Sequence, residues 1–200
     1  MTGPFFMPIM DLLKLKYQDF KKLNRYTFNY LLDTGKEITF RVKQYQFPHL
    51  VGLHKLTDIP LIAMFVDPTN SVVNAKYVIS KIKKEQLTEA QVRASTYFHS
   101  IQDRYNYLSS EAILSLAFNE VIVDFNKTIL TTSLQSDYIF IDRKTSGCLH
   151  LGIVKDGDEY YPETFFFNNT NYYTRGQTVI SIKRIRIFNE NGIQVLEQYI

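Results

Sequence analysis

The stretch YIFIDRKTSGCLHLGIVKDGDEYYPETFFFN, residues 138–168, decides the fold class. It contains runs rich in aromatic and β-branched residues, which short polar segments such as 155–158 separate. Runs of this length, joined by turns that contain glycine, are typical of neighbouring antiparallel strands. The strand-like runs of this half of the chain are 121–125, 128–133, 137–144, 148–154, 159–168 and 178–188. The sequence therefore predicts an antiparallel sheet over about residues 121–188.

Upstream of about residue 118 the pattern is mostly helical. Apolar residues recur at helical spacing between Leu12 and Leu23, and Thr88 with Gln91 fits a capping box at the start of a helix. The other segments with helical character are 47–56, 74–84, 88–107 and 109–118. Between them, runs 26–32 and 37–42 flank the turn cluster 33–36 and predict a β-hairpin.

Helices first and strands afterwards indicate the α+β class. We expect N-terminal helices packed on a C-terminal antiparallel β-sheet, with an N-terminal β-hairpin. Residues 1–200 are predicted to form a single domain with a core from about 20 to 190. No internal repeat or linker interrupts this pattern.

The amino-acid composition limits which classes of function the protein can have. The net charge of +3 is too small to identify a nucleic-acid binder by itself. The single cysteine, Cys148, excludes an intramolecular disulfide and lies in an apolar run, so we expect a buried strand residue. No stretch approaches the ~20 apolar residues of a membrane span, and the N-terminus lacks the basic region of a signal peptide. We expect a cytoplasmic protein with no membrane association.

The densest group of reactive side chains is His49, His54 and Lys55. On one continuous helix His49 and His54 would lie about 140° apart, so they would not face one metal ion as a pair four residues apart does. We therefore expect no metal site. Histidine titrates near neutral pH, which suits acid–base chemistry; a structural role in a capped helix is the alternative.

Two further residues, Thr164 and Arg104, are candidates for binding or catalysis. Thr164 follows Pro162, which inside a strand pattern favours an edge, a bulge or a strand start. Either the Thr164 hydroxyl forms a hydrogen bond to a phosphate oxygen, or Thr164 is an ordinary β-branched strand residue. Arg104 lies beside the apolar face of segment 98–108 and either reaches a phosphate or pairs with a carboxylate.

Basic residues also alternate in the last long strand run. In IKRIRI, residues 182–187, Arg184 and Arg186 share one face. They form either a phosphate-binding stripe or a solubilising edge. Lys144, in the charged segment 142–144, is a further candidate for RNA binding, although a charged turn is its simplest interpretation.

One family resemblance joins several of these motifs. FPHLVGLHK (47–55), a helix ending in IQDRYNYL (101–108), the DYIFIDRK strand (137–144) and a GCLHLGI strand (147–153) running into YYPETFF (160–166) resemble the fourth family of phage-type barnase–EndoU–colicin–RelE-like nucleases. The resemblance covers about residues 20–170. It implies a helix-plus-antiparallel-sheet core, RNA cleavage without a metal or cofactor, and His49, His54, Lys55, Arg104 and Thr164 as the matching site residues.

The resemblance also implies a mechanism and partners. A histidine would take the proton of a ribose 2′-hydroxyl, and a second histidine or Lys55 would protonate the leaving 5′-oxygen. RNA is then the expected substrate, and an immunity or antitoxin protein is a candidate partner. Two alternatives stay open: an inactive nuclease fold that inhibits a host protein, and a DNA-binding phage protein that uses the 182–187 stripe.

Overall fold

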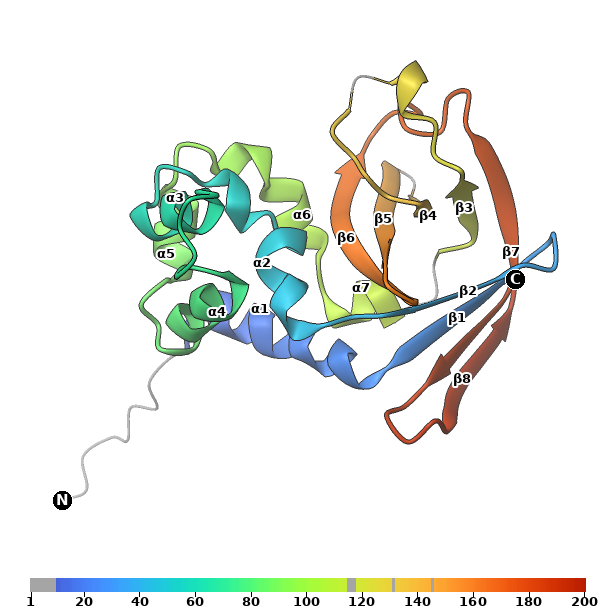
Figure 1. Cartoon of the computed structure of the whole chain (residues 1–200), viewed down its shortest axis with the longest axis horizontal. Helices are drawn as coiled ribbons and strands as arrows, with labels where there is room; N and C mark the ends of the chain where they lie inside the picture. The colour runs from blue at the N-terminus through green and yellow to red at the C-terminus, as the bar shows by residue number, and fades with distance from the viewer. Residues whose placement is uncertain (1–9, 115–117, 131, 145) are drawn as a thin grey trace.

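The computed structural model describes residues 10–114, 118–130, 132–144 and 146–200. Helices gather on one side of the molecule and strands on the other, and the first hairpin runs from the helical side into the sheet (Figure 1). The α-helices are α1 (Leu12–Lys21), α2 (Phe47–Leu50), α3 (Pro60–Val66), α4 (Ala75–Lys83), α5 (Glu89–Ala94), α6 (Gln102–Tyr107) and α7 (Ser110–Leu114). Short 3-10 turns are η1 (Lys22–Arg25), η2 (Gln44–Gln46), η3 (Leu53–Lys55), η4 (Phe98–Ser100) and η5 (Lys127–Ile129).

The strands belong to one sheet. They are β1 (Thr27–Leu32), β2 (Glu37–Arg41), β3 (Glu120–Val123), β4 (Tyr138–Lys144), β5 (Gly147–Asp156), β6 (Glu159–Asn168), β7 (Thr178–Phe188) and β8 (Gln194–Tyr199). Their order is β1-β2-β6-β5-β4-β3-β7-β8, and β7 also pairs with β1. Within the described residues the strands β1 to β7 therefore form a closed ring, from which β8 extends along β7.

The mixed α+β class is confirmed, and so is the hairpin of β1 and β2. Closure of the ring was not predicted. It brings the hairpin into the sheet, because β1 pairs with β7 in antiparallel fashion and β2 meets β6 in parallel fashion at Phe40 and Tyr160. The sheet is thus not purely antiparallel, and most of its strands have no open edge.

Aromatic side chains fill the closed ring. Phe28 stacks on Phe40, Tyr30 stacks on Phe40, and Phe140 packs against both Tyr30 and Phe40. All four side chains are fully buried and belong to the main hydrophobic core, which continues under the helices. The hairpin of β1 and β2 therefore shares one core with β4, although about 100 residues of chain separate them.

A second, smaller cluster covers the opposite face of β3, β4 and β5. Ile122, Ile139 and Ile141 pack there with Leu130 and Leu134 from the connection between β3 and β4. Cys148 is buried in the same cluster, as the sequence predicts. The predicted strand over 128–133 is wrong where the structure describes it: Asn126 accepts a hydrogen bond from the Thr128 N–H and starts the turn η5, and Thr131 lies outside the described residues.

Two predicted helices are shorter in the structure. Segment 88–107 divides into α5, η4 and α6, because the Asp58 carboxylate accepts hydrogen bonds from the Ser95 hydroxyl and the Thr96 N–H and draws the chain out of the helical path. The helix expected over 109–118 is described only as α7, since 115–117 lie outside the described residues. No helix within the described part of the chain is both long and apolar enough to span a bilayer.

Candidate functional site

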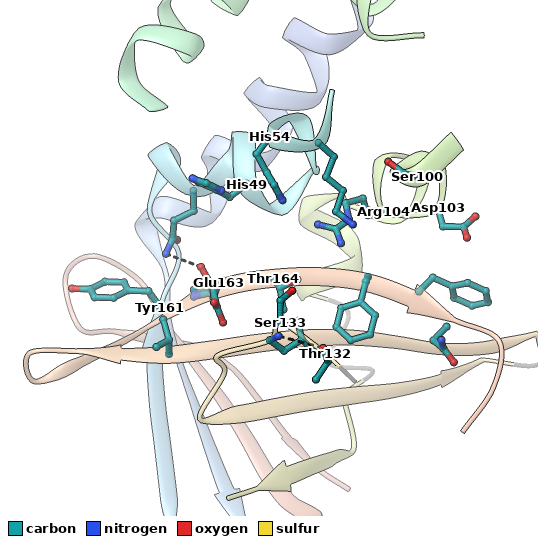
Figure 2. Close-up of a pocket in the computed structure, with 18 of the residues that line it drawn as sticks. His49, His54, Ser100, Asp103, Arg104, Thr132, Ser133, Tyr161, Glu163 and Thr164 are labelled. Carbon is teal, nitrogen blue, oxygen red and sulfur yellow. Dashed lines mark hydrogen bonds between the residues drawn. The ribbon is translucent and has the colours of Figure 1, made fainter. Parts of the chain in front are cut away.

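A cleft of about 810 Å³ separates the helices from the outer face of β6. Figure 2 shows His49, His54 and Arg104 projecting from the helical side toward Glu163 and Thr164 on β6. Five residues that the sequence singles out line this single cleft: His49, His54, Lys55, Arg104 and Thr164. They come from α2, η3, α6 and β6, elements that are far apart in the sequence.

Gly52 brings the two histidines together. Its backbone has a φ of 89°, in the left-handed region that favours glycine, and it ends α2 before η3 begins. The helical path is therefore interrupted between His49 and His54, and their ring centroids lie 5.1 Å apart. The expectation that the rings diverge by about 140° is wrong, because it assumed one continuous helix.

Both imidazoles are shifted toward the neutral form. Burial, followed by the nearby His49, Arg104 and Lys55, lowers the pKa of His54 to about 4. Burial of its ring against the neighbouring residues also lowers the pKa of His49, although the residue as a whole is exposed at the surface. The buried Nδ1 of His54 has no hydrogen-bond partner among the described residues. Because that Nδ1 is buried, Nε2 is the nitrogen at which the neutral ring can accept a proton from a molecule bound in the cleft.

Two cations face the same space. Within the described residues, no carboxylate forms an ion pair with Arg104 or Lys55. Arg104 is half-buried, and its side chain runs alongside Gly52. Burial and the charge of Arg104 lower the pKa of Lys55 from its usual 10.5. Lys55 is exposed, and two cations without an acidic partner among the described residues, one of them half-buried, are suited to bind an anion.

A bulge in β6 shapes the opposite wall. Thr164 pairs with Gly152 and Pro162 pairs with Ile153, so Glu163 is an extra residue in the ladder. The prediction of a bulge near Pro162 is confirmed. β6 lies between β2 and β5, but among the described residues it pairs with β2 only at Tyr160, so the side of Pro162 away from β5 has no strand partner. Glu163 and Thr164 consequently both line the cleft.

Hydrogen bonds hold this wall in place. Ser136 donates from its hydroxyl to Glu163 Oε2 at 2.9 Å. The buried Gln46 donates from Nε2 to the Pro162 carbonyl at 3.0 Å, and its Oε1 accepts from the Lys43 N–H. Gln46 directly precedes α2, so this bridge fixes the distance between His49 and the bulge.

The sequence motifs did not point to every residue of the cleft. His99 on η4 lines it, and its Nδ1 lies 3.0 Å from the Thr96 carbonyl, which leaves Nε2 directed elsewhere. Glu163 lies in the PET motif beside Thr164, yet only the bulge turns it toward the cleft. The aromatic residues Phe166 and Tyr173 complete one end of the cleft.

Three predicted RNA-binding residues lie elsewhere. Lys144 forms an ion pair with Asp142 at 2.6 Å and does not line the cleft. Arg184 and Arg186 share a face of β7, as predicted, but both lie close to Glu37 Oε1, at 3.7 and 2.9 Å. Arg186 also donates two hydrogen bonds to Asn29. Their charge is largely balanced by other side chains.

The donor set of the cleft is not that of a metal centre. Across the described residues, no group of three or more His, Cys, Asp or Glu side chains converges in a way that could hold a metal ion. The cleft instead combines imidazoles and cations with several hydroxyl groups, among them that of Thr164, and with carboxylates, among them that of Glu163.

Comparisons with known proteins agree with this architecture at the level of the family. No curated protein and no solved structure matches the chain. A family model described as "phage-Barnase-EndoU-ColicinE5/D-RelE like nuclease4" matches residues 12–199, which is nearly the whole chain. The chain therefore belongs to this family of nuclease-like proteins.

Proposed function

We propose that the protein is an endoribonuclease that cleaves RNA by metal-independent transesterification in the cleft between α2 and β6. The observation that carries the proposal is the pair of histidine rings, 5.1 Å apart, facing Arg104 and Lys55 on one side and Thr164 on the other. Membership of a nuclease family supports nucleic acid as the substrate.

The first step is proton transfer to a neutral imidazole. His54 accepts the proton of a ribose 2′-hydroxyl, and the 2′-oxygen attacks the adjacent phosphorus. The low pKa of His54 keeps the free ring neutral at pH 7. A phosphodiester anion bound between His49, His54 and Arg104 raises the pKa of both rings, because negative charge favours the protonated form.

The second step breaks the bond between phosphorus and the 5′-oxygen. His49 in its protonated form, or Lys55, donates a proton to that oxygen as it leaves. Arg104 stabilises the added negative charge on the phosphorane, and the Thr164 hydroxyl donates a hydrogen bond to a phosphoryl oxygen. The products are a 2′,3′-cyclic phosphate and a free 5′-hydroxyl, and no electron transfer is involved.

The experiment is an end-group assay. A short RNA is incubated with the wild-type protein in EDTA, and the products are separated by chromatography. We expect 2′,3′-cyclic phosphate ends, no cleavage of the same sequence made with 2′-deoxyribose, and a loss of about 10²–10⁴-fold in His54→Ala. Cleavage of the deoxy substrate, or a strict requirement for Mg²⁺, would rule out this mechanism.

A cellular assay adds a readout that does not depend on a chosen substrate. If the protein is a toxin-like effector, its expression arrests growth and degrades total RNA, and His54→Ala abolishes both effects. A folded protein with no cleavage of any RNA, and with His54→Ala indistinguishable from wild type, favours a binding role instead.

A further inference from the structure

A second cavity is lined by basic residues and shares no lining residue with the cleft. It has a volume of about 480 Å³ and forms where β1 begins, β2 ends and the turn between β7 and β8 passes. Arg25, Arg41 and Lys43 line it together with Tyr26, and Glu190 stands on the turn. No carboxylate within the described chain pairs with Arg25.

Lys43 connects the second cavity to the cleft. Its side chain lines the second cavity, and its ammonium lies 5.1 Å from the ring centroid of Tyr161, which lines the cleft. Tyr45, two residues further along, also lines the cleft and is exposed. The same segment then continues through Gln46 to His49, so one stretch of backbone carries cations, an exposed aromatic ring and a site histidine.

The cations of this cavity are available to an external anion. Arg41 and Lys43 share the carboxylate of Glu159 at 3.5 and 3.6 Å, and Arg41 is half exposed. Ion pairs this long on a wet surface contribute little. Arg41 donates one further hydrogen bond, from Nε to the Thr27 hydroxyl at 3.1 Å, whereas Arg186 on β7 donates three, two to Asn29 and one to Glu37.

We propose that single-stranded RNA extends from the cleft across Tyr161 and Lys43 into the second cavity, where Arg25, Arg41 and Lys43 bind its backbone phosphates. The inference rests on the proposed function and names its substrate class: a strand of several nucleotides, and not a dinucleotide. Cations in series bind phosphates regardless of base, and the exposed ring of Tyr45 offers a face on which a base can stack.

The test is a binding experiment with RNA that cannot be cleaved. Fluorescein-labelled 2′-O-methyl oligonucleotides lack the nucleophilic hydroxyl, and their affinities are measured by fluorescence anisotropy as functions of length and salt concentration. The variants are the double substitution Arg41→Gln/Lys43→Gln, the single substitution Glu159→Gln and the control Arg143→Gln. Arg143 pairs with Glu120 at 2.6 Å and lines neither cavity.

For wild type we expect affinity to rise with length beyond two nucleotides. The double variant should bind a ten-nucleotide strand about tenfold more weakly, with a salt slope smaller by about 1.4, since each phosphate contact on a single strand contributes about 0.7. Its affinity for a dinucleotide should not change. Glu159→Gln should bind the long strand more tightly, and Arg143→Gln should equal wild type.

Where wild type binds, any one of three results would overturn the inference: affinity that does not depend on length, an unchanged salt slope in the double variant, or the same loss in Arg143→Gln. These results leave the proposed function standing if the end-group assay shows cleavage. Conversely, length-dependent binding by a protein that cleaves nothing supports the phosphate path and removes the catalytic proposal. Absence of all binding by wild type overturns the inference directly.

Discussion

The backbone of Gly52 lies against the side chain of Arg104, so closely that a Cβ atom at residue 52 would overlap Arg104 Cδ and lie 2.7 Å from Cγ2 of Ile101. The turn that brings the two histidines together is therefore also the surface on which Arg104 rests. One glycine thus couples the positions of three candidate catalytic side chains.

Gly52→Ala is expected to damage both stability and activity. The φ of 89° strains any residue with a Cβ, and the new methyl must displace Arg104 and Ile101. We expect a loss of about 1–3 kcal/mol in the free energy of unfolding, measured with urea, and a strong loss of RNA cleavage. Gly35→Ala is the matched control, because Gly35 has a φ of 83° and no atom within 4 Å of its Cβ position. Gly35→Ala should lose only the stability that a positive φ costs an alanine. An equal loss of cleavage in both variants would show that the contact between residue 52 and Arg104 does not matter for activity.

The two lysines that the sequence singles out should behave differently. Lys55 lines the cleft without an acidic partner among the described residues, whereas Lys144 is paired with Asp142 outside it. Lys55→Gln should lower kcat/KM by about 10²-fold, as removal of one positioned group near a developing charge does. Lys144→Gln should keep kcat/KM within about twofold of wild type, because Lys144 does not line the cleft; the cost of leaving the buried Asp142 carboxylate without this partner falls on stability. Steady-state kinetics on a short RNA measures both losses. A larger loss of kcat/KM in Lys144→Gln than in Lys55→Gln would mean that the reacting phosphate does not bind beside Lys55.

The pH dependence of cleavage should reflect the pKa of about 4 at His54. A general base must be deprotonated, so kcat/KM rises with pH through the pKa of the free ring. The acidic limb of the profile should therefore lie well below pH 6.5, and cleavage should persist at pH 5–6. With Lys55 as the acid, its lowered pKa brings the alkaline limb below pH 10.5, whereas His49 as the acid would bring that limb below pH 6.5, so the position of the alkaline limb distinguishes the two acids. Proton NMR titration of the His54 ring checks the assignment without relying on activity, and a ring pKa at or above 6.5 would contradict it.

His150 should make the folded state sensitive to acid. Burial in β5, stacked on Phe166, lowers the pKa of its ring to about 4. The unfolded chain binds the proton at about pH 6.5 and the folded chain only near pH 4, so stability is complete above pH 6.5 and is lost as the pH falls toward 4. The loss from one such group is at most about 3 kcal/mol.

His150→Phe tests this because it keeps an aromatic ring and removes the titrating group. Urea unfolding at a series of pH values should show a shallower decline in the variant between pH 6.5 and 4. The decline should not vanish, because the lowered pKa of His54 acts in the same window with the same sign. Identical slopes in both proteins would assign the acid sensitivity to other groups.

The sequence alone determined the local structure and much of the site's composition. Alternation and turn chemistry located the strands from 138 to 188 and the hairpin 27–41, because the period of two and the glycine turns are local properties. The family motifs named His49, His54, Lys55, Arg104 and Thr164, all of which line the same cleft.

Only the tertiary structure decided how these elements meet. Alternation shows which face of a strand a residue occupies, but not which strand lies beside it. Glu37 neutralises Arg186 from 149 residues away, and this pairing exists only because β1 closes the ring against β7. The bulge that exposes Glu163 depends on the register between β5 and β6, and the approach of the two histidines depends on one left-handed glycine. Closure of the strand ring, the register between β5 and β6 and the φ of Gly52 depend on contacts between distant parts of the chain. The spacing of residues along the sequence therefore does not predict them.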